Sequence, residues 1–257
     1  MFCVGMDKAF TKGLLLIEAL ARSDAARGIS SLAADLELTK SNVHRLLSTL
    51  VAHDYVRQQE TNSAYLLGPK LWELGALVMS RLDVAKVAHG SMAALATATG
   101  ESVHLSILDG PEVIYIDKID GLHAVRAYSR IGGRAPAWCV ATGKAMLAFA
   151  PPEVVRAVEP HLSQFTDATV ADMDALRAEL QRIRTQRYAI NRGEWRKDVC
   201  GIAVPVYDTS RRVIAAVGIS GPAARLKTRQ IKVFAAEVMK AGEAISAALG
   251  FRPDGLD

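Results

Sequence analysis

Residues 30–51 read SSLAADLELTKSNVHRLLSTLV, and this stretch contains two short helical patterns separated by a polar turn. Ser30 or Ser31 is suited to cap the first helix, and Thr39 the second, because a hydroxyl oxygen can accept from a free backbone N–H. Apolar residues at helical spacing predict a buried stripe on the second helix: Val43, Leu46, Leu47, Leu50 and Val51. Two helices joined by a tight turn are typical of a helix-turn-helix.

The segments on either side extend this motif to a small domain. Upstream, residues 13–21 (GLLLIEALA) repeat apolar side chains at helical spacing. Downstream, residues 55–59 and 64–67 form two short strand patterns, with the turn-forming ETNS of residues 60–63 between them. Three helices followed by a β-hairpin predict a winged helix-turn-helix domain over residues 1–68.

The second helix of the motif has a polar face opposite its apolar stripe. Small polar and basic side chains at the start of such a helix reach base edges and phosphates, and no acidic residue occurs between Lys40 and His53. The alternative is the solvated face of an ordinary three-helix protein, but the flanking helix and hairpin favour double-stranded operator DNA as the partner. The candidate DNA contacts are Arg27, Ser30, Lys40, Ser41, Asn42, His44, Arg45, Ser48 and Arg57.

The charge balance of this domain argues against tight binding by a single copy. The whole chain has 31 Lys and Arg against 27 Asp and Glu, a net charge of +4. Residues 1–80 contain eight basic and eight acidic residues, so the domain is neutral and only its DNA-facing surface can be basic. Because few phosphates can be neutralised per copy, we expect that binding requires dimerisation.

The rest of the chain changes character. Pro69 can open a helix, and residues 69–82 are expected to form a linker helix. In residues 83–257, antiparallel strands with helices at both ends predict an α+β domain, one sheet flanked by helices. The expected helices cover residues 83–99, 142–149, 153–158, 172–184 and 227–249. The expected strands cover residues 103–108, 113–116, 124–129, 201–207 and 213–220.

Several classes of protein are disfavoured by what the sequence lacks. Three widely spaced cysteines, Cys3, Cys139 and Cys200, indicate no disulfide framework and fit a reducing compartment. With no secretory signal and no apolar run long enough to span a bilayer, we expect a cytoplasmic protein with no membrane partner. Scattered histidines and the absence of a phosphate-binding glycine loop predict no metal and no cofactor.

The same residues carry a resemblance to a known family. KGLLLIEAL (12–20), SLAADLELTKSNVHRLL (31–47) and YLLGPKL (65–71) resemble the DNA-binding half of IclR-family bacterial transcription regulators. IGGRAPAWCVATGKA (131–145), YAINRGEW (188–195), GIAVPV (201–206) and VGISGP (217–222) resemble signatures of that family's second half. The resemblance covers roughly residues 8–250. It implies a GAF-like effector-binding domain over residues 83–257, a homodimer or homotetramer (a dimer of dimers), and control of a catabolic operon by a small organic acid.

An effector site is expected where the chain enters the helix at residue 142. Free amides at a helix start favour a carboxylate, although Thr142 could equally be an ordinary cap. The resemblance places ligand contacts at Ala141 and Thr142, and further pocket positions at Ala127, Asn191, Gly201, Gly218 and Ser220; Trp138 is expected to cover the pocket or to belong to the core. The family often has an acid at position 191, a cysteine or another side chain at 201, and a serine at 218. The smaller glycines predict a wider pocket, which favours an aromatic carboxylate over a two-carbon acid.

Two other classes of function remain open on the sequence. GAF-like domains can host thiol chemistry, so Cys139 and Cys200 allow a thiol-dependent reductase with an appended helical domain. A catalytic thiol needs a lowered pKa, whereas a buried cysteine is usually inert. The third possibility is a module that binds only other proteins. We favour a ligand-responsive DNA-binding regulator, which is not an enzyme.

Overall fold

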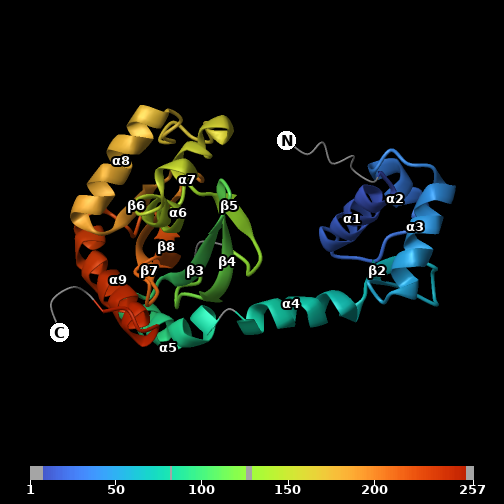
Figure 1. The fold of residues 1–257 in the computed structure, drawn as a ribbon, viewed down its shortest axis with the longest axis horizontal. Helices are drawn as coiled ribbons and strands as arrows, with labels where there is room; N and C mark the ends of the chain where they lie inside the picture. Colours follow the sequence, from blue (N-terminus) through green and yellow to red (C-terminus); the bar gives the residue numbers. More distant parts are fainter. Residues whose placement is uncertain (1–7, 82, 126–128, 253–257) are drawn as a thin grey trace. The chain divides into compact units, whose positions relative to one another are not determined.

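The computed structural model describes residues 8–81, 83–125 and 129–252. The chain forms two compact units, residues 1–82 and 83–257. Each unit has its own elements and its own hydrophobic core (Figure 1).

The first unit is a winged helix-turn-helix, as predicted. Helices α1 (Lys8–Ala21), α2 (Ile29–Asp35) and α3 (Lys40–Ala52) are followed by the antiparallel strands β1 (Val56–Gln58) and β2 (Tyr65–Leu67). Helix α4 (Pro69–Arg81) begins at the proline expected to open it and belongs to this unit. Leu16, Leu32, Val43 and Leu47 are fully buried among the three helices and form the centre of its core.

The two predicted helix caps have opposite outcomes. Thr39 caps α3, since its hydroxyl oxygen accepts from the Asn42 backbone N–H at 3.3 Å. The prediction that Ser30 or Ser31 caps α2 is wrong, because the helix begins earlier, at Ile29, with Gly28 before it. The predicted stripe on α3 is buried only as far as Leu47. Leu50 is half-buried and Val51 is exposed, because only Leu50 of the last turn packs against the core cluster.

The second unit is an α+β domain built on one antiparallel sheet, as predicted. Its strand order is β5-β4-β3-β8-β7-β6. The strands are β3 (Ser102–Asp109), β4 (Glu112–Ile119), β5 (Arg134–Pro136), β6 (Ala189–Arg192), β7 (Val199–Tyr207) and β8 (Val213–Pro222). The helices are α5 (Asp83–Thr99), α6 (Ala141–Leu147), α7 (Pro152–Arg156), α8 (Met173–Gln186) and α9 (Thr228–Ala248), with a 3-10 turn at Glu159–His161. Helices α5 and α9 pack against each other and the sheet, and α6 packs on β7 and β8 (Figure 1).

The edges of this sheet differ from the prediction. Strands β5 and β6 were not expected, and the expected strand over 124–129 is absent at residues 124, 125 and 129. Residues 126–128 lie outside the described part of the chain. The expected helices over 142–149 and 153–158 are shorter, because α6 ends at Leu147 and α7 at Arg156.

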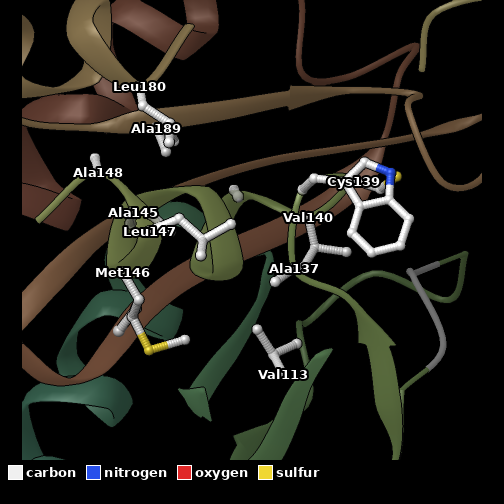
Figure 2. Packing of buried hydrophobic residues seen from close by; sticks show 14 of the residues in the cluster. Val113, Ala137, Cys139, Val140, Ala145, Met146, Leu147, Ala148, Leu180 and Ala189 are labelled. Carbon is white, nitrogen blue, oxygen red and sulfur yellow. The ribbon is translucent and has the colours of Figure 1, made fainter. Parts of the chain in front are cut away.

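Helix α6 is fixed in the centre of the unit. All seven of its residues are buried, and Figure 2 shows Ala145 and Leu147 of this helix within the hydrophobic cluster that also contains Ala137 and Val140. A Cβ atom at Gly143 would lie 2.2 Å from the Ala137 carbonyl oxygen, so only glycine allows the helix to lie this close to the segment before it. The start of α6 is therefore held rigidly beside the sheet.

Candidate nucleic-acid interface and ligand cavity

The polar face of α3 is presented to solvent as the sequence predicts. Lys40, Ser41, His44, Arg45 and Ser48 are exposed, and Asn42 is half-buried. The Ser48 hydroxyl donates to the His44 carbonyl oxygen at 2.9 Å, so within the helix its oxygen remains free to accept. Arg57 is exposed on β1 of the wing, and Ser30 is exposed in the first turn of α2.

The α3 face is basic although residues 1–80 together carry no net charge. Away from α3, ion pairs join Glu18 to Arg22, Asp35 to Arg27 and Glu73 to Lys70. Within the described residues, Lys40, Arg45 and Arg57 form no ion pair, and α3 has no acidic residue. The exposed face of α3 therefore offers uncompensated positive charge, which a phosphate backbone attracts.

Arg27 differs from the other candidate contacts because its guanidinium is already engaged. Nη1 donates to Asp35 Oδ2 at 2.7 Å and Nη2 donates to Ser31 Oγ at 2.5 Å. Its side chain is only 18% exposed, and its backbone forms a β-bridge with Tyr65. Arg27 thus joins α2 to the wing, and its guanidinium is less free to meet DNA than those of the other candidate contacts.

A cavity of about 50 Å³ lies in the second unit where the start of α6, the sheet and the turn after β6 meet. Sheet register explains how residues far apart in sequence reach it, because Asn191 of β6 pairs with Gly201 of β7, which pairs with Ser220 of β8. The lining residues are His104, Tyr115, Ser129, Val140, Ala141, Thr142, Asn191, Trp195, Arg196, Val199, Gly201, Gly218, Ile219 and Ser220. The structure therefore brings together six of the eight sequence-predicted positions.

A chain of hydrogen bonds crosses the cavity through His104. Its Nε2 lies 2.6 Å from Ser220 Oγ, and its Nδ1 lies 3.0 Å from Ser129 Oγ. Burial lowers the pKa of His104 to about 4, and the nearby Lys118 cation adds to this effect. The imidazole is therefore neutral near pH 7, so one serine donates to it while the other accepts from it. In the sequence His104 stands between Val103 and Leu105, and that alternation predicts only a strand residue with satisfied hydrogen bonds.

Two further polar side chains have hydrogen-bonding capacity left for a ligand. Ser106 Oγ donates to Thr142 Oγ1 at 3.2 Å, which leaves the Thr142 hydroxyl free to donate. The Asn191 side-chain oxygen accepts from the Glu194 backbone N–H at 2.9 Å. Its amide NH₂ group makes no hydrogen bond within the described residues. Both residues are buried apart from the atoms that face the cavity, so a ligand oxygen there could accept from donors that are largely shielded from bulk water.

Arg196 supplies positive charge at the edge of the cavity. Its guanidinium carbon lies 4.7 Å from the centre of the Trp195 ring, a cation–π contact that orients an exposed side chain. Among the described residues it has no acidic partner. Arg196 carried no signal in the sequence, because the family-like motif ends at residue 195.

A buried ion pair joins the two walls of the cavity. Lys144 on α6 is fully buried, and its Nζ donates to the Glu194 carboxylate oxygens at 2.7 and 2.6 Å. Glu179 on α8 lies 3.4 Å from the same nitrogen. Burial raises the pKa of Glu194, and the Lys144 ammonium opposes that rise. This pair holds the turn after β6, which carries Trp195 and Arg196, against α6.

Two expectations about the cavity walls need correction. Trp138 is buried in the core beside Phe165 and does not line the cavity, because its ring is packed within the cluster below α6. A Cβ at Gly218 would lie 2.4 Å from the Ile202 carbonyl oxygen, so glycine there permits close strand packing and does not widen the cavity. At Gly201 a Cβ would lie 2.9 Å from the Ile219 carbonyl oxygen. Ala127 lies outside the described residues.

The two described cysteines lack the environment that thiol chemistry needs. Burial raises the pKa of Cys139 to about 12 and also raises the pKa of Cys200. Both thiols are buried and free. A thiolate is the reactive form of cysteine, so neither residue supports the thiol-reductase alternative. Within the described residues, every helix is too short or too polar to cross a membrane.

The comparisons with known proteins agree with this architecture. Residues 9–60 match the IclR helix-turn-helix domain, and residues 76–247 match the bacterial transcriptional regulator IclR C-terminal domain. The HTH-type transcriptional regulator XynR of Escherichia coli is 38% identical over 225 residues, covering 87% of this chain and 89% of that protein. The regulator KdgR of E. coli is 34% identical over 226 residues, covering 87% and 86%.

Solved structures show the same fold. The Thermotoga maritima IclR structure has a TM-score of 0.79 at 27% identity and covers 94% of this chain and 98% of that one. An IclR homolog from Microbacterium hydrocarbonoxydans, crystallised with 4-hydroxybenzoate, has a TM-score of 0.83 at 24% identity and covers 95% and 99%. From its two matched domains and its curated relatives, the chain belongs to the IclR family of bacterial transcriptional regulators.

Proposed function

We propose that this regulator binds a small organic carboxylate in the cavity beside α6, and that binding changes its affinity for operator DNA upstream of a catabolic operon. The observation that carries the proposal is the convergence of the Thr142 hydroxyl and the Asn191 amide with the Arg196 cation around one cavity. Hydrogen-bond donors with capacity left and a nearby cation are the chemistry that a carboxylate requires.

The size and lining of the cavity narrow the class of effector. Since one water occupies about 10–15 Å³ on this measure, a cavity of about 50 Å³ has room for a ligand of only a few heavy atoms. His104, Ser129 and Ser220 add hydroxyl and imidazole groups that can pair with further oxygens. We therefore favour a short hydroxy or oxo acid. An aromatic acid would require the exposed Arg196 or the half-buried Trp195 to swing outward.

The DNA side of the proposal needs two copies of the chain. Exposed apolar side chains on α1 (Leu14 and Leu15) and on α4 (Trp72, 81% exposed) offer surfaces that a second copy can bury. Two recognition helices about 34–36 Å apart would meet successive major grooves of one operator. The effector can shift DNA affinity only if it binds one arrangement of these copies more tightly than the other.

Thermal unfolding with candidate acids tests the effector site. Glycolate, glycerate, pyruvate and benzoate serve as probes, and a true effector at 100 times its Kd stabilises the folded state by about 2.7 kcal/mol. We expect Arg196→Gln to weaken binding of the responding acid at least tenfold, because its counter-charge is lost. Arg229→Gln, an exposed arginine outside the cavity lining, is the matched control and is expected to behave as the parent.

The DNA arm uses the fragment upstream of the protein's own gene. The responding acid is expected to change the affinity of the parent for this fragment and to leave that of Arg196→Gln nearly unchanged at the same concentration. If all four acids leave both the unfolding temperature and the DNA affinity unaltered, or if Arg196→Gln responds like the parent, the proposed cavity is not the effector site.

A further inference from the structure

A second, larger hollow lies in the effector unit beyond the C-terminal end of α6. It is a groove of about 630 Å³ between the end of β7, the C-terminal end of α8 and one face of α9. Phe149, which follows α6, lies in its wall. Its volume is within the range of about 300–1,000 Å³ that is usual for small-molecule sites. None of the residues lining the first cavity belongs to it.

The floor of the groove is an edge of β7 that cannot accept another strand. Strand β6 pairs with β7 only as far as Ala203, so Val204–Tyr207 has no neighbour in the sheet on that side. Pro205 has no N–H, and the Tyr207 N–H donates to Ser246 Oγ of α9 at 3.0 Å. Residues two apart in a strand direct their N–H groups to the same side, so this edge has no free donor for an extended peptide.

Aromatic rings form the apolar part of the groove. The centres of the Tyr207 and Phe251 rings are 4.9 Å apart with an interplanar angle of 23°, a stacked arrangement. Phe149 meets Tyr207 edge-on, with ring centres 6.0 Å apart at 75°. All three side chains line the groove, so a flat apolar ligand would meet a wall of aromatic rings that are already held in place by one another.

Arginines from the end of α8 give the groove a positive charge. Arg187 ends the helix in the left-handed conformation (φ 66°), and its exposed guanidinium makes no hydrogen bond or ion pair within the described residues. Its charge opposes the rise that burial gives the pKa of Tyr207, which places the two groups near each other. Arg184 is partly engaged, because its Nε donates to the Ala148 carbonyl oxygen. Against the one acid in the lining, Glu243, two arginines leave one net positive charge.

We propose that this groove is a second ligand site, which takes a small aromatic carboxylate with its ring against Phe149 and Tyr207 and its carboxylate on Arg187. The blocked strand edge disfavours a peptide, while the ring cluster and the unpaired guanidinium match the two parts of such an acid. The site stands independently of the effector proposed for the first cavity.

Calorimetric titration of the full-length protein with 2-naphthoate tests this site, with naphthalene-2-methanol as the uncharged probe. We expect one naphthoate per chain, weaker binding of the alcohol, and at least a tenfold loss of naphthoate affinity in Arg187→Gln, with recovery in Arg187→Lys. Ala247→Tyr, which places a ring in the groove from the exposed face of α9, is expected to abolish binding. Arg177→Gln, on the first half of the same helix, is the matched control.

Three results would overturn the proposal. The first is that the parent does not bind naphthoate. If Arg187→Gln or Ala247→Tyr also changes the oligomeric state, the groove is a contact between subunits. The second is equal naphthoate affinity in the parent and in Arg187→Gln. Because Arg187 lies on the surface, this comparison remains valid even if Ala247→Tyr misfolds. The third is loss of binding in Arg196→Gln but not in Arg187→Gln, which would place naphthoate in the first cavity.

Discussion

His104 links the chemistry of the cavity to the stability of the folded protein. Its pKa is lowered to about 4 in the folded state from an ordinary value of 6.5, chiefly by burial. Between these two values the unfolded chain binds more protons than the folded one, so stability rises with pH over this range. The contribution is fully present above pH 6.5 and is lost as the pH falls toward 4.

We therefore expect acid to destabilise the parent more than a variant without this imidazole. Between pH 6.5 and 4, the free energy of unfolding of the parent should fall by about 3 kcal/mol more than that of His104→Gln. Urea unfolding at the two pH values measures the loss of stability in the parent and in His104→Gln. Each protein is compared with itself at pH 6.5. Equal losses in the two proteins would mean that His104 is not held neutral by burial.

The cavity residues show what could be predicted from sequence at the level of single positions. Family motifs identified Asn191, Gly201 and Ser220, which the sheet register then aligns across three strands. His104 and Arg196 carried no such signal, because alternation along a strand does not reveal which residues of distant strands will surround a buried side chain. The role of Gly218 was misjudged for the same reason, since the carbonyl that a Cβ there would strike belongs to another strand.

Helix α6 depends on one buried ion pair for its connection to the turn after β6. Lys144→Met leaves the Glu194 carboxylate buried without its cation, which we expect to cost roughly 3–5 kcal/mol of stability. Lys144→Met/Glu194→Gln removes both charges and should lose less than the sum of the two single variants. Urea unfolding of the four proteins gives the coupling energy.

An exposed pair on α8 provides the control for that comparison. Arg177 and Asp174 form an ion pair with largely exposed side chains, so Arg177→Gln is expected to change stability by less than about 1 kcal/mol. If Lys144→Met costs no more than Arg177→Gln, or if the double variant loses the full sum, the buried pair does not hold these two elements together.

The elements with long, regular patterns were predictable, and the short ones at the sheet edges were not. Helix α9 and the β3–β4 and β7–β8 hairpins were expected within a few residues of their observed limits. Strands β5 and β6 have three and four residues, too few for a periodic pattern, and they exist because β4 and β7 offer them a partner. The start of α2 was misplaced because the helix begins after Gly28 without a side-chain cap, so the serines that follow gave a misleading signal.

At the scale of the whole molecule, a DNA-binding unit with almost no net charge can still bind DNA if its charge is unevenly distributed. Counting charges over residues 1–80 gives zero, but α3 carries Lys40 and Arg45 with no acidic residue on the helix, and neither forms an ion pair among the described residues. Net charge therefore underestimates the local field at α3. If two copies associate through the exposed apolar side chains of α1 and α4, two α3 faces can bind one operator together, and the affinity of the pair exceeds that of either copy.

The most direct test of this account is the salt dependence of binding to the DNA upstream of the protein's own gene, measured by fluorescence anisotropy for the parent, Arg45→Ala and Arg22→Ala. Arg22 is an exposed arginine on α1 that is paired with Glu18, so its variant is the matched control. We expect Arg45→Ala to weaken binding roughly tenfold. If Arg45 contacts a phosphate, the salt slope should fall by about one unit; if it contacts a base, sequence specificity should be lost at one base pair. Arg22→Ala should bind as the parent does. Unchanged affinity and slope in Arg45→Ala, or an equal loss in Arg22→Ala, would contradict the assignment of α3 as the DNA-reading helix.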